Sequence, residues 1–303
     1  MLVFGLALAF CLTPWGSPPL ALALGLVVAL VFGNPWVAQS RKYTSQLLQY
    51  SVVGLGFGMN ARQAMQAGRE GIGFTVASIF GTLILGFLVG RWLNIDRKTA
   101  HLISCGTAIC GGSAIAAVGP VLKAEEAQMS VALGTVFVLN SVALFLFPAL
   151  GHWLQMTQHQ FGLWCAIAIH DTSSVVGAAS HYGDQALQIA TTVKLARALW
   201  IIPVSLGTAF LFKTPGTKVT LPYFILGFVA AMLLNTYVAA LHPIAPVAVY
   251  LAKLGLTVTL FLIGAGLSAQ VLRSVGVRPF VQGMLLWVVI STVSLWVILQ
   301  TVG

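Results

Sequence analysis

Long apolar stretches separated by short polar turns run through the whole chain of 303 residues. A helix needs about 20 mainly apolar residues to cross the hydrocarbon core of a bilayer. By that measure the pattern predicts about eleven transmembrane helices, although the first stretch is too short to decide whether it crosses. The stretches cover residues 1–12, 19–33, 44–59, 71–92, 99–122, 127–150, 160–180, 185–212, 221–240, 243–267 and 279–302.

Composition supports a membrane protein. Hydrophobic residues make up 58% of the chain and charged residues 7%, and the mean hydropathy is +0.95. Soluble domains carry about 25% charged residues, so nearly the whole chain must face lipid or other protein segments. We therefore predict an all-α membrane protein with a single transmembrane domain over residues 1–303. The net charge of +9 is spread over short turns and does not indicate nucleic-acid binding.

The basic residues predict the orientation. If eleven helices cross, nine of the fifteen lysines and arginines fall on one side of the membrane and three on the other. The positive-inside rule then places the N-terminus in the cytoplasm and the C-terminus outside. The nine are Arg41, Lys42, Arg91, Arg97, Lys98, Lys213, Lys218, Arg273 and Arg278; the three are Arg62, Arg69 and Lys123; Lys194, Arg197 and Lys253 lie inside the stretches.

Charged residues occur where a membrane helix tolerates them least. His170 and Asp171 lie within one apolar stretch, and Lys194 and Arg197 lie within the next. A charge at such a depth costs about 2.5–3.5 kcal/mol on insertion scales. Asp171 lies twelve residues before the turn at Gly183 and Lys194 lies eleven after it, so we expect the two side chains to meet at one level. An ionisable residue inside the membrane is a functional-site hypothesis by default.

A run of small residues between 104 and 120 predicts a broken helix. Gly111 and Gly112 weaken the helix at its midpoint, and Ser113 is a plausible N-cap for a second half. The N-terminus of a half-helix at mid-membrane carries a partial positive charge that suits an anion. Thr107 and Cys110 in the same run join the candidate substrate-binding residues. The alternative is an unbroken helix whose small residues only allow close packing.

A second helix start is predicted at His170, in the middle of its own apolar stretch. Asp171 can cap the half-helix, and the hydroxyls that follow it can coordinate a substrate or an ion; they belong to Thr172, Ser173 and Ser174. The alternative is a purely structural Asp171–Lys194 pair. Lys194 and Arg197 are three residues apart and share a helix face. One carboxylate cannot neutralise both, which leaves one positive charge for an anionic ligand.

The sequence also contains a weak internal similarity, here called the internal echo. The residues GFGM at 56–59 correspond to GAGL at 264–267, at an offset of 208 residues. The two copies lie seven predicted helices apart, and an odd number means opposite orientations, as in inverted-repeat transporters. A repeat of five plus five helices would separate them by five, so the repeat boundary stays unresolved.

Three segments resemble a known family. GTAICGGSAIAAVGPVLKAEEAQMSVAL, AIHDTSSVVGAAS and ATTVKLARAL look like the signatures of the YeiH family of bacterial inner-membrane proteins, which carry a sulfate-exporter label. The resemblance covers nearly the entire chain and keeps the order and spacing of the segments. It implies the fold of the bile-acid symporter and cation–proton antiporter superfamily, with inverted repeats and crossed broken helices. It also implies a location in the bacterial inner membrane.

These features predict a secondary transporter of a small anion, of the sulfate, sulfonate or carboxylate type. Both helix breaks would form the site, and Lys194 and Arg197 would supply positive charge. His170 or Asp171 would carry a coupling proton, or Asp171 and neighbouring hydroxyls would hold a sodium ion. A cation–proton antiporter that uses the Asp171/Lys194 pair is the nearest alternative.

A membrane-embedded enzyme is the alternative from another class. The sequence has no GxSxG, HExxH or nucleotide-binding motif, so we do not expect an enzyme. The spacing of the four cysteines indicates no metal site, and neither a metal nor a cofactor is expected. The expected partners are the anion, the coupling ion and the lipid bilayer, with a homodimer left open.

Overall fold

The structure is a computed structural model that describes residues 2–13, 16, 18–32, 37–212, 223–266 and 276–302. Every regular element within these ranges is helical. The elements are α1 (Leu2–Cys11), α2 (Pro18–Val31), α3 (Val37–Gly56), α4 (Ala61–Trp92), α5 (Arg97–Ala108), α6 (Gly112–Val121), α7 (Glu126–Trp153), α8 (Gln158–Ala168), α9 (Thr172–Tyr182), α10 (Asp184–Ala198), α11 (Ile201–Leu211), α12 (Tyr223–Tyr237), the 3₁₀ turn η1 (Ala239–Leu241), α13 (Ala245–Gly266) and α15 (Val277–Thr301).

The predicted apolar stretches all contain helix, which confirms the all-α fold. Within the described residues, five segments are long and apolar enough to cross a membrane. They are Gly71–Trp92 in α4, Ala127–Trp153 in α7, Asp184–Leu211 across α10 and α11, Ala245–Gly266 in α13, and Val277–Thr301 in α15.

The stretch at 99–122 breaks as predicted but does not cross. The ammonium of Lys98, at the start of α5, donates to the carbonyl of Lys123 beyond the end of α6 at 2.9 Å. Gln128 Nε2 likewise donates to the carboxylate of Asp96 at 2.8 Å. Both ends of the segment therefore lie together, and α5 and α6 form a helical hairpin. With 12 and 10 residues, its arms are about 18 and 15 Å long and reach only about half the depth of a bilayer.

The stretch at 160–180 folds back in the same way. The hydroxyl of Tyr182, at the end of α9, donates to the carbonyl of Met156, just before α8, at 2.6 Å. The side-chain oxygen of Gln158 accepts from the backbone N–H of Gln185 at 3.0 Å. Midway along the arms, the thiol of Cys165 donates to the carbonyl of Val175 at 3.6 Å. The expectation that these two stretches cross the membrane is therefore wrong, because each break reverses the chain direction.

The two hairpins enter from opposite ends of the molecule. Hairpin 1 (α5–α6) starts and ends at the end that carries Arg97, Lys98 and Lys123, here called the basic end. The long helix α7 then runs to the other end, where hairpin 2 (α8–α9) starts and ends. Their tips meet, since a Cβ on Gly111 would lie 3.4 Å from the Cα of Asp171. Irregular backbone at membrane depth is tolerated where it is buried in protein or lines a cavity.

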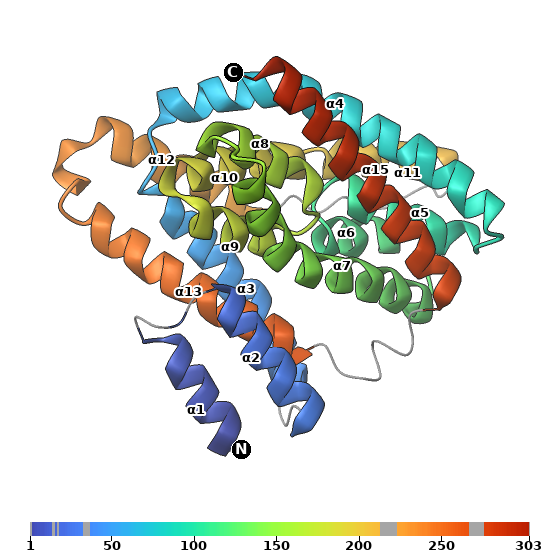
Figure 1. Cartoon of the computed structure of the whole chain (residues 1–303), viewed down its shortest axis with the longest axis horizontal. Coiled ribbons are helices and arrows are strands. Elements are labelled where there is room, and N and C mark those ends of the chain that lie inside the picture. The colour runs from blue at the N-terminus through green and yellow to red at the C-terminus, as the bar shows by residue number, and fades with distance from the viewer. Residues whose placement is uncertain are drawn as a thin grey trace.

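The helices form two bundles (Figure 1). The hairpin bundle holds α4–α11 and α15, with α4 and α15 side by side. The flanking bundle holds α1, α2, α3, α12 and α13, and α13 packs along both α2 and α3. Glycines let these helices approach closely: a Cβ on Gly25 would lie 2.1 Å from the carbonyl oxygen of Phe261, and one on Gly264 would lie 2.2 Å from that of Leu22. The bundles meet through fewer contacts, chiefly α9 against α13 and α2.

Parts of the sequence predictions fall outside the described residues. These are Lys213, Lys218 and Arg273 of the charge count and Leu267 of the internal echo.

Candidate functional site

The tip of hairpin 1 is built by glycine. Gly111 has φ +64° and ψ −124°, a conformation that only glycine adopts readily. Its N–H donates to the carbonyl of Gly106 at 2.8 Å, which closes the last turn of α5. The predicted break is confirmed, but the prediction that Ser113 caps α6 is wrong. Gly111 is the N-cap and has no side chain to cap the helix, the Cys110 side chain bonds the N–H of Ala114, and Ser113 lies exposed in the first turn.

The tip of hairpin 2 is capped by a carboxylate, as predicted. Asp171 is the N-cap of α9 and has extended backbone geometry. Its Oδ2 accepts from the N–H and the hydroxyl of Ser174, each at 3.1 Å, and from the hydroxyl of Ser173. The carboxylate charge is therefore held against the positive end of α9, where the helix dipole stabilises it. Thr172 is the first residue of the helix and is buried.

Lys194 lies at the depth of this tip, as predicted, but its hydrogen-bond partners are carbonyls. The buried ammonium donates to the carbonyl of Ile169 at 2.6 Å and to that of Ala166 at 3.3 Å. No ion pair within 4.0 Å joins the carboxylate of Asp171 to Lys194 or Arg197, all three of which the structure describes. The expected Asp171–Lys194 contact is therefore absent, because Lys194 caps the negative end of α8.

Arg197 caps the other hairpin. Its fully buried guanidinium donates to the carbonyl of Ala108, at the end of α5, with an Nη2–O distance of 2.5 Å. Nη1 also donates to the hydroxyl of Ser78 on α4 at 3.2 Å. One face of α10 therefore holds the C-terminal ends of both inward helices, α5 through Arg197 and α8 through Lys194.

Several buried polar groups around the tips have no protein partner. They are the hydroxyl of Thr107, both ring nitrogens of His170, the amide nitrogen of Asn140 and Nε of Arg197. Buried polar atoms are normally hydrogen-bonded, since an unmade bond costs about 1–3 kcal/mol. The tips thus bring together several buried polar groups whose hydrogen-bonding capacity the protein itself does not use. Cys110, in contrast, packs in an apolar cluster.

Sequence reasoning missed two residues of this site. Asn140 on α7 accepts the N–H of His170 through its side-chain oxygen at 3.1 Å and so positions the tip of hairpin 2. Ser78 on α4 accepts from Arg197. The lone amide in the apolar stretch 127–150 was a usable signal for Asn140. No comparable signal marks Ser78, since single serines are common in membrane helices.

Charge at the tips is unbalanced. Within the described part of the chain, the side chains of Lys, Arg, Asp and Glu that are buried are Asp171, Lys194 and Arg197. With His170 neutral, these three groups sum to one positive charge. The two cations are offset by one carboxylate and by the helix-end carbonyls that accept their hydrogen bonds, since a buried charge is costly unless it is paired.

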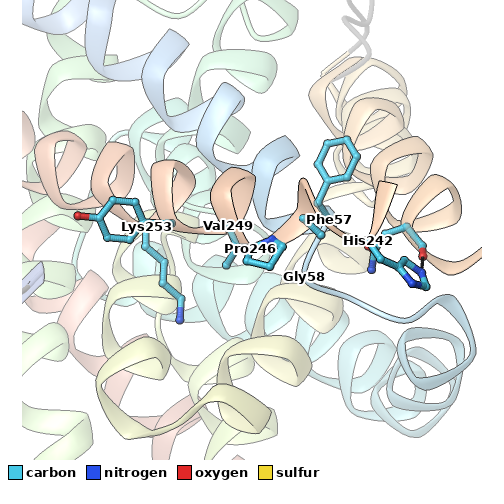
Figure 2. A pocket seen from close by; sticks show the side chains of 9 residues that line it. Phe57, Gly58, His242, Pro246, Val249 and Lys253 are labelled. Carbon is cyan, nitrogen blue, oxygen red and sulfur yellow. Dashed lines mark hydrogen bonds between the residues drawn. The ribbon is translucent and has the colours of Figure 1, made fainter. Parts of the chain in front are cut away.

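A surface pocket of about 610 Å³ lies apart from the tips, lined by α12, α13, His242 after η1, and Phe57 and Gly58 after α3 (Figure 2). Figure 2 shows Lys253 at one edge, extending away from α13. Its ammonium is paired with the exposed carboxylate of Asp184 at 3.1 Å. Lys253 is on the flanking bundle and Asp184 begins α10, so the pair bridges the bundles.

A groove of about 430 Å³ lies between α4 and α15. Its lining is mainly apolar and includes Ser78, the partner of Arg197.

The fold and the tips define an α-helical membrane protein in which two half-length hairpins, from opposite ends, meet around buried charges. The chain belongs to the family described as Conserved hypothetical protein 698, which matches residues 3–283. No solved structure matches the chain.

The chain is also similar to bacterial membrane proteins. It is 58% identical over 283 residues to a UPF0324 membrane protein of Bacteroides thetaiotaomicron, covering 93% of this chain and 86% of the relative. It is 57% identical over 291 residues to one of Porphyromonas gingivalis, covering 95% and 88%. It is 52% identical over 305 residues to one of Bdellovibrio bacteriovorus, covering 98% and 94%. These names describe membrane proteins and assign no substrate, so the sulfate-exporter label stays a prediction.

Proposed function

We propose that the protein is a secondary transporter that moves a small anion by alternating access and binds it where the hairpin tips meet. The observation that carries this proposal is the arrangement of charge at the tips. Two helix N-termini and two buried cations surround a single carboxylate, that of Asp171. Half-helices that start near mid-membrane form the substrate sites of many secondary transporters, and their N-termini favour negative charge.

Coupling is assigned to hairpin 2. Asp171 and His170 lie side by side at the tip, and the imidazole is buried without a partner. A proton on either group, or a sodium ion held by Asp171 and the hydroxyl groups, would link transport to an ion gradient. The cation–proton antiporter alternative depends on a direct Asp171–Lys194 pair. That pair is not formed within 4.0 Å, so anion transport is the better supported reading. We propose no enzymatic activity.

An inverted repeat is supported by element lengths. Shifted by 208 residues, α3 falls on 245–264, where α13 lies, and α4 falls on 269–300, where α15 lies. These partners run antiparallel, as neighbours show: Gly54 approaches Ala252 while Gly58 approaches Val249. Hairpin 1 with α7 and hairpin 2 with α10–α11 would be the remaining pair, at offsets near 60. The first copy then has three helices, a hairpin and a long helix, whereas the second begins with its hairpin and long helix and ends with three helices. This difference in order explains why the matching glycine segments lie seven predicted helices apart.

The hairpins also sharpen the proposed orientation. Lys123 moves to the majority side, because it lies beside Lys98 at the basic end. The charge asymmetry of the sequence then rises from nine against three to ten against two. This supports a cytoplasmic basic end in the bacterial inner membrane, with the N-terminus inside and the end of α15 outside.

Flux into proteoliposomes tests the proposal. Radiolabelled sulfate, methanesulfonate and Na⁺ are offered to liposomes that contain the full chain. We expect saturable anion uptake that Arg197→Gln abolishes and that Arg278→Gln, a change at an exposed arginine, leaves intact. Anion uptake equal to that of empty liposomes would contradict the proposal, and saturable Na⁺ uptake without anion uptake would favour the antiporter.

A further inference from the structure

The apolar groove of about 430 Å³ opens between α4 and α15, which lie side by side (Figure 1). Both helices contain candidate membrane spans. The rim of the groove is exposed and includes Val289 and Val293 of α15, whereas its floor is buried and includes Ile167 of α8 and Ile290 of α15. The groove is therefore a hollow in the side of the hairpin bundle, and in a bilayer its open side faces the lipid.

Small residues of α4 leave this space open. Gly73, Ala77 and Gly81 line the groove at intervals of four residues and so share one helix face. Elsewhere on α4 a glycine lets another helix approach, as at Gly86, where a Cβ would lie 2.0 Å from the hydroxyl oxygen of Ser104. A Cβ on Gly73 or Gly81 would have no atom of the described residues within 4 Å. This face of α4 is thus not used to pack the described chain against itself.

One polar side chain connects the groove to the buried charges. Ser78 lines the groove between Ala77 and Gly81, and its hydroxyl accepts from Nη1 of Arg197 at 3.2 Å. The same hydroxyl donates to the carbonyl of Thr75 at 3.0 Å, a local bond within α4 that it can exchange for an oxyanion. Arg197 also keeps a buried Nε–H that has no partner in the described part of the chain. An anion at Ser78 would therefore lie beside a cation, with mainly apolar lining on either side.

We propose that the groove binds the alkyl chain of an amphipathic anion whose sulfonate or carboxylate head lies at Ser78, beside Arg197. This inference rests on the proposed function and names its substrate class, anions that carry an alkyl chain. From Ser78 the groove runs to Leu85 in one direction and to Gly73 in the other, about 10 and 8 Å at 1.5 Å per residue. Burial of the chain there adds to the affinity that the head alone supplies.

Charge distinguishes this ligand from a membrane lipid. Ser78 lies at the depth of the hairpin tips, because its partner Arg197 also donates to the carbonyl of Ala108 at the end of α5. A phospholipid keeps its charged head at the membrane surface, so only its apolar tail would reach Ser78. An amphipathic substrate brings its charge and its chain to the same place. The lining comes from α4, α8 and α15, so head and chain both contact the hairpin bundle.

Competition for uptake tests the binding of the chain. Proteoliposomes that contain the full chain take up radiolabelled methanesulfonate, and unlabelled methanesulfonate or octanesulfonate competes. We expect octanesulfonate to reach half-inhibition at a concentration about tenfold or more lower than methanesulfonate does, since each buried CH₂ adds to affinity. Gly81→Leu and Gly73→Leu each place a side chain in one arm of the groove. The variant in the arm that holds the chain should remove this difference and leave competition by methanesulfonate unchanged.

Two further variants complete the design. Gly207→Leu adds the same side chain to α11, where a Cβ likewise has no described atom within 4 Å, and this matched control should keep the difference. Ser78→Ala removes a contact to the head and none to the chain. It should therefore raise both half-inhibitory concentrations by a similar factor, about tenfold, because it removes a hydrogen bond to a charged group. A shift for octanesulfonate alone, or no shift, would overturn the position of the head.

The remaining outcomes separate the two proposals. If uptake of methanesulfonate equals that of empty liposomes, the proposed function is wrong and this inference is wrong with it. If methanesulfonate is taken up but Gly81→Leu and Gly73→Leu both keep the full difference, or no difference exists, lipid fills the groove; anion transport then stands without this inference. If Gly81→Leu lowers the mass of the protein in detergent, measured by light scattering, a second copy occupies the groove and the inference is overturned.

Discussion

The flanking bundle and the hairpin bundle are both built of apolar helices, but they differ in how their buried polar groups are bonded and in how closely their helices approach. In the flanking bundle, buried hydroxyls bond within their own helix, as Thr257 does to the carbonyl of Lys253 and Thr259 to that of Gly255. Backbones approach closely at Gly25 and Gly264. In the hairpin bundle, helices stop halfway and buried charges remain unbalanced. Hydroxyls also bond within their own helices in the hairpin bundle, as Ser104 and Ser294 do, so the difference lies at the hairpin tips. If the tips bind an anion as proposed, they give up stability for that binding, whereas the flanking bundle supplies rigidity.

The strongest test of this division is Asp171→Asn in the hairpin bundle. Asparagine keeps an acceptor for the N–H of Ser174 but removes the charge that offsets Lys194 and Arg197. We expect anion flux in proteoliposomes to fall about 100-fold or more, since charged hydrogen bonds contribute about 1.5–3 kcal/mol each. Thermal unfolding in detergent should still show folded protein. Asp184→Asn, at an exposed carboxylate, is the control; equal flux in both variants would break the comparison.

Lys194→Met tests whether the buried cation is structural as well as electrostatic. Methionine has a similar length but leaves the carbonyls of Ile169 and Ala166 without their donor. We expect a loss of about 3 kcal/mol in unfolding free energy, because each unpaired buried group costs about 1–3 kcal/mol, together with a loss of flux. Lys123→Met, which changes an exposed lysine side chain, is the control. An unchanged melting temperature in Lys194→Met would refute the capping role.

Gly25→Leu probes the flanking bundle. Its Cβ would lie 2.1 Å from the carbonyl oxygen of Phe261, so α2 and α13 must separate. Overpacking of this kind costs about 1–3 kcal/mol. We expect a lower melting temperature but unchanged flux per folded molecule. Gly5→Leu, where a Cβ would have nothing within 4 Å, should change neither. Loss of flux at full stability in Gly25→Leu would show that the flanking bundle takes part in transport.

Lys253→Met has the smallest expected effect. The ion pair with Asp184 bridges the bundles, but the two side chains are 43% and 85% exposed. Exposed pairs contribute about 0–1 kcal/mol and are screened by salt. We expect a change in melting temperature near the limit of detection at 0.15 M salt, with calorimetry as the measurement. A large loss of stability would mean that this contact, and not the apolar packing of α9, holds the bundles together.

The sequence was sufficient for the helices and for where two of them break. Apolar length placed all the stretches, and Gly111 and Asp171 marked both breaks because their residue types favour helix starts. The path after each break was not predicted. Glycine frees the backbone at 111, but the contacts between the two ends of the segment, of Lys98 with Lys123 and of Gln128 with Asp96, show that the chain turns back.

The partners of the buried charges were also missed. A carbonyl at a helix end attracts a cation as a carboxylate does. A carboxylate can be identified from its residue type, whereas the carbonyls left free at a helix end become known only when the end of the helix is known. Lys194 was therefore assigned to Asp171 and not to Ile169. Matching AICGGS at 108–113 with AIHDTS at 168–173 would have shown that the two hairpin tips have similar sequences, since that repeat is visible in the residues alone.

The end of α15 touches the start of hairpin 2, where Gln160 Nε2 donates to the carbonyl of Val302 at 2.7 Å. A short linker could therefore join residue 302 to residue 158 without moving any helix. If the chain were also opened between α7 and α8 and between α11 and α12, two polypeptides would result. Each would run through three helices, one hairpin and a last long helix in the same order, with α1 as an addition to the first. Co-expressed from separate genes, such halves should assemble through the same contacts that join them within the single chain.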